Sequence, residues 1–235
     1  PSDEAILSAR IVDRTIRPLF EGHIRNDVQV IITVLAIDED DPDILGVIGA
    51  SLALAISETP WNGPVSAVRI GKKGDGDLLV NPTYEVRDDA DYSFDLIACG
   101  KDGNINMIEV GAHQVSEDFA MQALERASSE IERIQEWQKQ IIKDLGMEKR
   151  VIEKPVASAE LTKLFETDIV PNLENAVFSG AGKAGIKKLH ETWKETYKHA
   201  FPEEDVSFVA NDMFDEAINK TLHDGALDQN KRADG

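Results

Sequence analysis

The sequence is poor in cysteine, in long apolar runs and in positive charge, and each shortage excludes a class of protein. Cys99 is the one cysteine among 235 residues, which excludes an intramolecular disulfide and a cysteine-ligated zinc site and suits a reducing compartment. No stretch reaches the roughly 20 apolar residues that a membrane-spanning helix needs, because the runs Val28 to Ile37 and Ile44 to Ile56 are too short. We therefore predict a cytoplasmic protein without a membrane contact.

Positive charge is scarce because 44 aspartates and glutamates stand against 25 lysines and arginines, which gives a formal net charge of −19. The field of such a protein repels polyanions at long range. Composition alone therefore argues against nucleic acid as a partner. Only a local cluster of lysines and arginines could reverse this interpretation, because phosphate affinity depends on where the cations are placed.

Hydrophobic residues make up 42% of the sequence, and their spacing predicts a mixed region followed by a helical one. In the mixed region we expect three helices, at residues 3–17, 44–57 and 117–145. We also expect a strand buried on both faces at 27–37 and two hairpins, at 65–80 and 94–110. Gly146 is expected to be a left-handed stop for the third helix. Beyond Met147 only helices are predicted, including 183–201 and a last one after Asn211. The fold class is therefore α+β, followed by a small all-α domain.

Three arginines on the first predicted helix form the sharpest local feature. Arg10, Arg14 and Arg17 are spaced i, i+4 and i+7, so their guanidinium groups project from one face. Such a row could bind successive phosphates of a nucleic acid. Alternatively, Asp13 could tie Arg10 and Arg17 into a structural ion network, and the spacing leaves both interpretations open.

Other patterns that resemble functional sites have ordinary explanations. Gly180 to Gly185 matches G-x-G-x-x-G, but a dinucleotide site needs a buried strand before it, and 173–178 is predicted to be helical. The acidic loop from Asp38 to Asp43 lacks the glycine and the distal glutamate of a calcium loop. The histidines show no H-E-x-x-H pattern, and Cys99 lies in an apolar strand. These patterns predict no catalytic residue and no metal site.

Residues Ser8 to Phe20, with the sequence SARIVDRTIRPLF, resemble a long and specific helix motif of the bacterial polynucleotide phosphorylases. The segments Trp61 to Pro64 and Asn81 to Thr83 follow in the order that this family uses. Lys231 to Gly235 resembles the start of the family's second core domain. The resemblance covers nearly the whole chain, and both ends stop abruptly, as expected of a piece of a longer protein.

The resemblance implies a fold with two RNase-PH-like core domains, of the ribosomal-S5-domain-2-like kind, joined by an all-helical domain. In this chain, residues 1–146 would be the first core domain without its opening strands. Residues 147–227 would be the all-helical linker domain, and 228–235 would begin the second core.

The resemblance also implies an activity for the longer protein. Members of the family are polyribonucleotide nucleotidyltransferases, magnesium-dependent 3′-to-5′ exoribonucleases that use inorganic phosphate to degrade single-stranded RNA to nucleoside diphosphates. The complete enzyme would be a cytoplasmic homotrimer that acts in mRNA catabolism, with an RNA-degradation complex as a possible further partner.

This sequence departs from the family's active core at two places. Asp41-Pro42-Asp43 stands where the phosphate-binding serines would be, and carboxylates there would repel phosphate. Asp89 and Asp95 resemble the family's metal-binding acidic pair, but Ile97 occupies the position of its lysine. The resemblance therefore implies a degenerate acidic pair, no catalytic residue and no magnesium bound by this part of the protein.

By the same resemblance, the helix of Arg10, Arg14 and Arg17 lies near the RNA channel, which makes these residues the candidate RNA-binding and phosphate-binding site. The chain would then be a non-catalytic half that supports the trimer and guides RNA. Two alternatives stay open. One is an assembly module without direct RNA contact, and the other is a core domain with its own phosphorolytic site.

Overall fold

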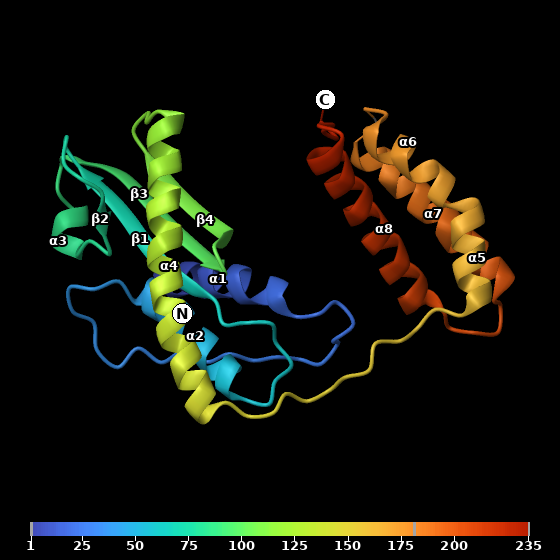
Figure 1. Ribbon diagram of the computed structural model, residues 1–235, viewed down its shortest axis with the longest axis horizontal. Coiled ribbons are helices and arrows are strands. Elements are labelled where there is room, and N and C mark those ends of the chain that lie inside the picture. The colour runs from blue at the N-terminus through green and yellow to red at the C-terminus, as the bar shows by residue number, and fades with distance from the viewer. Residues whose placement is uncertain (1, 181, 235) are drawn as a thin grey trace. The chain divides into compact units, whose positions relative to one another are not determined.

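The computed structural model describes residues 2–180 and 182–234. The chain divides into two compact units, the first ending at Ile152 and the second beginning at Glu153 (Figure 1). The first unit combines helices with one antiparallel sheet, and the second is helical. None of the helices in these described ranges is long and apolar enough to cross a membrane.

The sheet of the first unit has four antiparallel strands in the order β2-β1-β3-β4. These are β1 (Ser66–Lys73), β2 (Leu79–Val80), β3 (Tyr92–Lys101) and β4 (Asn104–Ala112), with the short helix α3 (Tyr84–Arg87) between β2 and β3. Both predicted hairpins are confirmed, as β1–β2 and β3–β4. The central pair, β1 and β3, joins the two hairpins in one register from Ser66 opposite Gly100 to Lys72 opposite Phe94, and the register shifts at Lys73.

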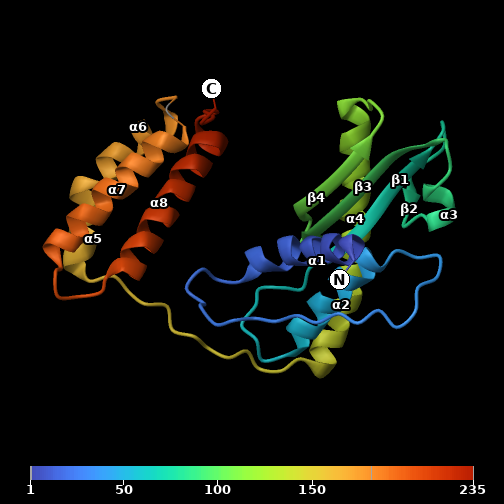
Figure 2. The same cartoon turned by 180° about the vertical axis from the view of Figure 1, so that it is seen from behind.

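Helices cover both faces of this sheet (Figures 1 and 2). Alternate residues of β1 and β3 pack with α4 (Glu117–Leu145), in a cluster that includes Val68, Ile70, Leu96, Ala98, Ala127 and Ile131. The residues between them pack with α1 (Asp3–Ile16) and α2 (Pro42–Ile56), in a cluster that includes Val12, Val47, Ala67, Ile97 and Cys99. The period of two along each strand therefore builds a three-layer core.

Side-chain caps begin these helices where the sequence predicts them. The hydroxyl groups of Ser2 and Ser116 accept backbone N–H groups in the first turns of α1 and α4. The left-handed stop predicted at Gly146 is wrong, because its φ is −65°. Glycine is nevertheless required there, since an added Cβ would lie 2.4 Å from the carbonyl oxygen of Ile142.

The strand predicted over Asp27 to Ile37 is wrong. This segment carries no regular secondary structure, and Ile31 and Leu35 are 76% and 92% exposed. A buried strand needs neighbouring strands for its N–H and C=O groups, and none of β1 to β4 pairs with it. The β-branched pattern is therefore present without the pairing that would make it a strand.

The second unit contains four α-helices in its described residues, α5 (Ala159–Asp168), α6 (Leu173–Phe178), α7 (Lys183–Ala200) and α8 (Ser207–Asp228). Trp193 is fully buried at its centre, with ring centroids 5.0 Å from Phe165 and 5.4 Å from Tyr197. The helix predicted over 183–201 is confirmed, while the last helix begins at Ser207, four residues before the predicted Asn211. An α+β domain followed by a small all-α domain is therefore the observed fold class.

Candidate nucleic-acid interface

Of the three predicted site residues, Arg10 and Arg14 lie on the solvent face of α1 and Arg17 is the C-cap of this helix. Ser2 caps this helix, Asp3 and Glu4 stand in its first turn, and Pro18 follows it. The buried residues of α1 are Ile11, Val12, Thr15 and Ile16. Because these residues turn one face toward the core, Arg10, Arg14 and Arg17 are all exposed on the other.

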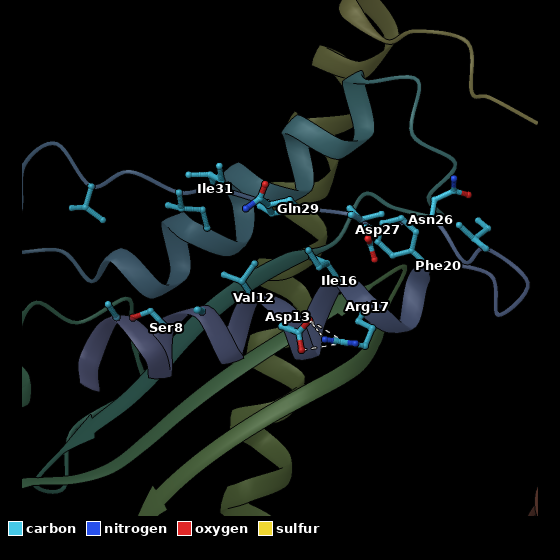
Figure 3. Close-up of a pocket in the computed structure, with 17 residues that line it drawn as sticks. Ser8, Val12, Asp13, Ile16, Arg17, Phe20, Asn26, Asp27, Gln29 and Ile31 are labelled. Carbon is cyan, nitrogen blue, oxygen red and sulfur yellow. Dashed lines mark hydrogen bonds and ion pairs between the residues drawn. The ribbon is translucent and has the colours of Figure 1, made fainter. Parts of the chain in front are cut away.

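The arginines differ in their partners. Arg14 pairs with Glu109 of β4, and Arg17 Nη2 lies 2.6 Å from Asp13 Oδ1, as the dashed lines in Figure 3 show for the Asp13–Arg17 pair. Arg10 has no hydrogen bond or ion pair within the part of the chain that the structure describes. The alternative in which Asp13 ties Arg10 to Arg17 is therefore realised for Arg17 only.

These ion pairs are exposed, and exposure decides how available the cations are. The side chains of Arg14 and Arg17 are 46% and 76% exposed, and those of their carboxylate partners are 50% exposed. Exposed pairs contribute about 0–1 kcal/mol each. A phosphate group can therefore replace either carboxylate at little cost.

A cavity of about 830 Å³ lies between α1 and the extended segment 24–34. Its lining includes the apolar side chains of Val12, Ile16 and Phe20 (Figure 3). Asp13 of α1 and Arg17, the C-cap of this helix, add charged groups. Arg17 is the only member of the arginine stripe that lines this hollow. The arginine stripe, which consists of Arg10, Arg14 and Arg17, therefore extends from the exposed face of α1 to the edge of this cavity.

A second group of charges surrounds the start of α2. Arg69 Nη2 lies 2.5 Å and Arg87 Nη1 2.7 Å from Asp41 Oδ2, and the side chains of Arg69 and Asp41 are 4% and 8% exposed. Burial raises the pKa of Asp43, although a hydrogen bond from Ser8 opposes this shift. Burial also works to lower the pKa of Arg69, but the carboxylates of Asp95 and Asp41 outweigh it and the net shift is upward.

Our sequence predictions missed Arg69 and Arg87. The available signal was an arginine in the middle of the apolar stretch 65–70, since a buried strand accommodates a guanidinium only beside carboxylates. The partners themselves could not be read from the pattern, because Asp41 lies 28 and Asp95 26 residues away.

The degenerate acidic pair is divided between two cations. Lys73 Nζ lies 2.5 Å from Asp89 Oδ2, and the hydrogen bond from Lys73 lowers the pKa of Asp89. Asp95 accepts from Arg69 Nη1 at 2.5 Å and from the Tyr92 hydroxyl at 2.7 Å. No group of three or more potential ligand side chains in the described ranges could hold a metal ion. With a cation already on each carboxylate, this pair does not fit a magnesium ion.

Ile97, at the position of the family's lysine, is 5% exposed and lies opposite Arg69 across the sheet. Its aliphatic side chain packs in the core with α1 and α2. It therefore cannot supply the positive charge of the family's lysine.

The glycine-rich motif of the second unit joins two helices. α6 ends at Phe178, and Gly180 and Gly182 have positive φ values of 78° and 55° before α7 begins; Ala181 lies outside the described residues. The helix predicted over 173–178 is confirmed, so the buried strand that a dinucleotide motif requires does not precede these glycines. From their sequence pattern alone, the lysines of α7 fit weaker phosphate contacts and a solvated helix face equally well; they are Lys183, Lys187, Lys188, Lys194 and Lys198.

Comparison with known proteins is consistent with this architecture. Residues 1–60 match the 3′ exoribonuclease family, domain 1, and residues 63–130 match domain 2 of the same family. The two matches meet between α2 and β1. The chain belongs to the 3′ exoribonuclease family, with an RNase-PH-like core.

Within that family, the chain is similar to polyribonucleotide nucleotidyltransferases. It is 36% identical to that of Syntrophomonas wolfei over 99% of this chain and 33% of the relative. It is 36% identical to that of Thermomicrobium roseum over 100% of this chain and 31% of the relative, and 39% identical to that of Listeria welshimeri over 84% and 28%. The chain thus spans about a third of the length of these curated relatives.

Proposed function

We propose that this chain is the non-catalytic, RNA-guiding part of a phosphorolytic 3′-to-5′ exoribonuclease, a polyribonucleotide nucleotidyltransferase. In that reaction an oxygen of inorganic phosphate attacks the last phosphodiester of single-stranded RNA. The bond to the 3′ oxygen of the preceding nucleotide breaks, and a nucleoside diphosphate leaves. The longer enzyme would be a cytoplasmic homotrimer that uses magnesium and takes part in an RNA-degradation complex.

The observation that carries this proposal is the contrast between two groups of arginines. Arg10, Arg14 and Arg17 are exposed on one helix face, whereas Arg69 is buried among carboxylates. Exposed guanidinium groups on one helix face can bind the phosphates of a polyanion. The acidic pair that would be needed for catalysis is already neutralised by Lys73 and Arg69.

The proposed domain arrangement follows the same family. The α+β unit would be the first core domain, and α5 to α8 would be the linker domain. The segment 228–235, which follows the end of α8, would begin the second core.

Two measurements separate this proposal from its alternatives. In the first, the chain is incubated with poly(A), inorganic phosphate and magnesium, and ADP is measured. We expect none, because Lys73 and Arg69 already pair with Asp89 and Asp95, and the Asp41 carboxylate would repel phosphate. Clear ADP release would instead establish a core domain with its own phosphorolytic site.

The second measurement tests the arginine stripe in the full-length enzyme. Arg14→Asp or Arg17→Asp should weaken RNA binding several-fold and lower the slope of log affinity against log salt by about 1, because one phosphate contact is lost. Activity should fall with affinity.

Arg133 of α4 supplies a matched control. Its side chain is 77% exposed and pairs with Glu130, much as Arg17 is 76% exposed and pairs with Asp13. Arg133→Asp should leave RNA affinity unchanged. If Arg17→Asp and Arg133→Asp weaken RNA binding equally, the effect comes from the change in net charge and not from the position of Arg17. If the trimer is lost while RNA affinity is unchanged, the assembly module is favoured.

A further inference from the structure

Helix α7 of the helical unit carries an excess of positive charge in an acidic chain. Its 18 residues include five lysines and two glutamates, whereas the whole chain has a formal net charge of −19. Affinity for phosphate groups depends on where cations are placed and not on the net charge. The positions of these lysines around the helix therefore decide what the local charge can bind.

Four of the five lysines form one stripe along α7. Lys183, Lys187, Lys194 and Lys198 are spaced i, i+4, i+11 and i+15. At 3.6 residues per turn they lie within about 60° of one another around the helix axis, over a length of about 22 Å. This lysine stripe is a linear row of cations, so one extended polyanion can contact it from end to end.

The lysine stripe is available to a ligand. Lys183, Lys187 and Lys198 are exposed, and Lys194 is half-buried. Lys187 Nζ lies 4.0 Å from Glu191 Oε1, and these two side chains are 78% and 62% exposed. The other three lysines of the stripe have no ion pair within residues 2–180 and 182–234, which the structure describes. Because an exposed pair at this distance is weak, all four ammonium groups can bind an external anion.

The stability of α7 does not account for the start of the stripe. Lys183 is the first residue of the helix, where the positive partial charge of the N-terminus disfavours a lysine. Gly182 precedes it, and no side chain of the described residues caps this end. In the pair of Lys187 with Glu191 the lysine comes first, which is the less favourable order on a helix. A lysine beside first-turn N–H groups stabilises the helix little but suits a phosphate oxygen.

The occupant that this stripe fits is the phosphate backbone of a single RNA strand. A linear row of cations complements a linear row of phosphates. Trp193 and Tyr197 of α7 are buried, so the helix offers no exposed tryptophan or tyrosine on which bases could stack. For the same reason the stripe lacks the apolar side chains with which a basic helix enters a lipid surface. The contact is therefore to phosphates and not to bases.

We propose that the lysine stripe of α7 binds the phosphate backbone of single-stranded RNA, without base preference, in addition to the arginines of α1. The identity of the polyanion rests on the proposed function. The contact itself lies in the helical unit, to which the proposed function assigns no RNA contact.

Fluorescence anisotropy of labelled oligo(A) with the 235-residue chain tests the proposal. Lys183→Gln/Lys198→Gln removes the two ends of the stripe and keeps the helix propensity of α7. We expect the affinity at about 50 mM salt to fall about 10-fold or more, and the slope of log affinity against log salt to fall by about 1.4, because two phosphate contacts are lost. Oligo(U) should show the same loss, because the contact does not involve bases.

Lys143→Gln/Lys163→Gln is the matched control, because both lysines are exposed and have no ion pair in the part of the chain that the structure describes. A loss for the α7 variant no larger than for this control overturns the proposal, as does a loss with oligo(A) but not with oligo(U).

Arg10→Gln/Arg14→Gln tests the proposed function separately. If this variant of α1 loses RNA affinity while the α7 variant keeps it, the proposed function stands and the lysine stripe is refuted. If only the α7 variant loses affinity, the lysine stripe stands and RNA guidance by the arginines of α1 is refuted.

A second measurement requires no variant. The lysines of the natural chain are acetylated with and without oligo(A), and the modified peptides are quantified by mass spectrometry. Bound RNA should slow the acetylation of Lys183 and Lys198 several-fold and leave Lys143 and Lys163 unchanged. Equal rates at Lys183 and Lys198 with and without RNA overturn the proposal, even if the α7 variant binds RNA weakly.

Discussion

Gln138 supports the contact between α2 and α4, and its replacement gives a sharp test of the fold. This side chain is fully buried. Its Oε1 accepts the Ser51 hydroxyl at 2.8 Å, and its Nε2 donates to the carbonyl of Val65 at 2.9 Å. The Ser51 oxygen in turn accepts the N–H of Val65 at 2.9 Å. One amide group therefore connects α4 to α2 and to the residue before β1.

The size of the effect follows from these two hydrogen bonds. Gln138→Met keeps the length of the side chain but leaves the Ser51 hydroxyl and the Val65 carbonyl without this partner in a buried place. Each unsatisfied group costs about 1–2 kcal/mol, so the first unit should lose about 2–4 kcal/mol of unfolding free energy. The equilibrium constant for opening of the first unit is then about 30- to 1,000-fold larger.

Native-state hydrogen exchange of peptides from α2 and α4 measures this equilibrium separately from the helical unit. The slowest amides should exchange faster by the same factor, while peptides of α5 to α8 keep their rates. Gln140→Met, two residues away on the exposed surface of the same helix, should have little effect. Exchange in Gln138→Met within about threefold of Gln140→Met would refute the hydrogen-bond argument.

Two further predictions concern Lys149, which is half-buried, and Cys99, which is buried. Lys149 Nζ donates to three carbonyls at the C-terminal end of α2, so Lys149→Met should lower the urea-unfolding free energy by about 1–2 kcal/mol, whereas Lys143→Met on the exposed end of α4 should not. Burial raises the pKa of the Cys99 thiol from 9.0 to about 11, so its contribution to stability is complete below pH 9 and is lost as the pH rises through 11. Because Cys99 is also fully buried, its alkylation by iodoacetamide at pH 8.5 should be at least about 100-fold slower than that of a free thiol, and an equal rate would contradict this.

The helices of the first unit were predictable because their signals are local. Capping residues such as Ser2 and Ser116 act within one turn, and Pro18 prevents continuation of α1 by removing a donor. The hairpins were predictable for the same reason, since β3 and β4 are joined by Asp102 and Gly103, both with positive φ. A prediction from sequence succeeds where the decisive contact lies a few residues away.

The segment 27–37 shows the opposite case. Its β-branched residues satisfy the pattern of a buried strand, but a strand also depends on a partner whose position the local sequence does not encode. Likewise, the left-handed stop expected at Gly146 follows a statistical preference, whereas the actual requirement is the approach of its backbone to Ile142. The first expectation is wrong because no strand pairs with this segment, and the second because a close contact within the helix, four residues back, fixes the glycine.

The exposure of Arg10, Arg14 and Arg17 on one face was predictable from the sequence, but their ion pairs were not. The spacing of Arg10, Arg14 and Arg17 placed them on one face, as the structure has them. Glu109, the partner of Arg14, lies 95 residues away in the chain, so it could not be found by spacing. Pairing therefore had to come from the structure.

The net charge of −19 treats every arginine alike, and burial is what separates them. Arg17 and Arg69 both lie beside aspartates, so each counts as neutralised in a sum over the sequence. The side chain of Arg17 is 76% exposed, while that of Arg69 is 4% exposed. Opening the exposed pair costs little, whereas opening the buried one leaves a desolvated charge without a partner. An acidic chain can therefore keep its surface guanidinium groups available to a polyanion while its buried guanidinium groups remain paired with carboxylates.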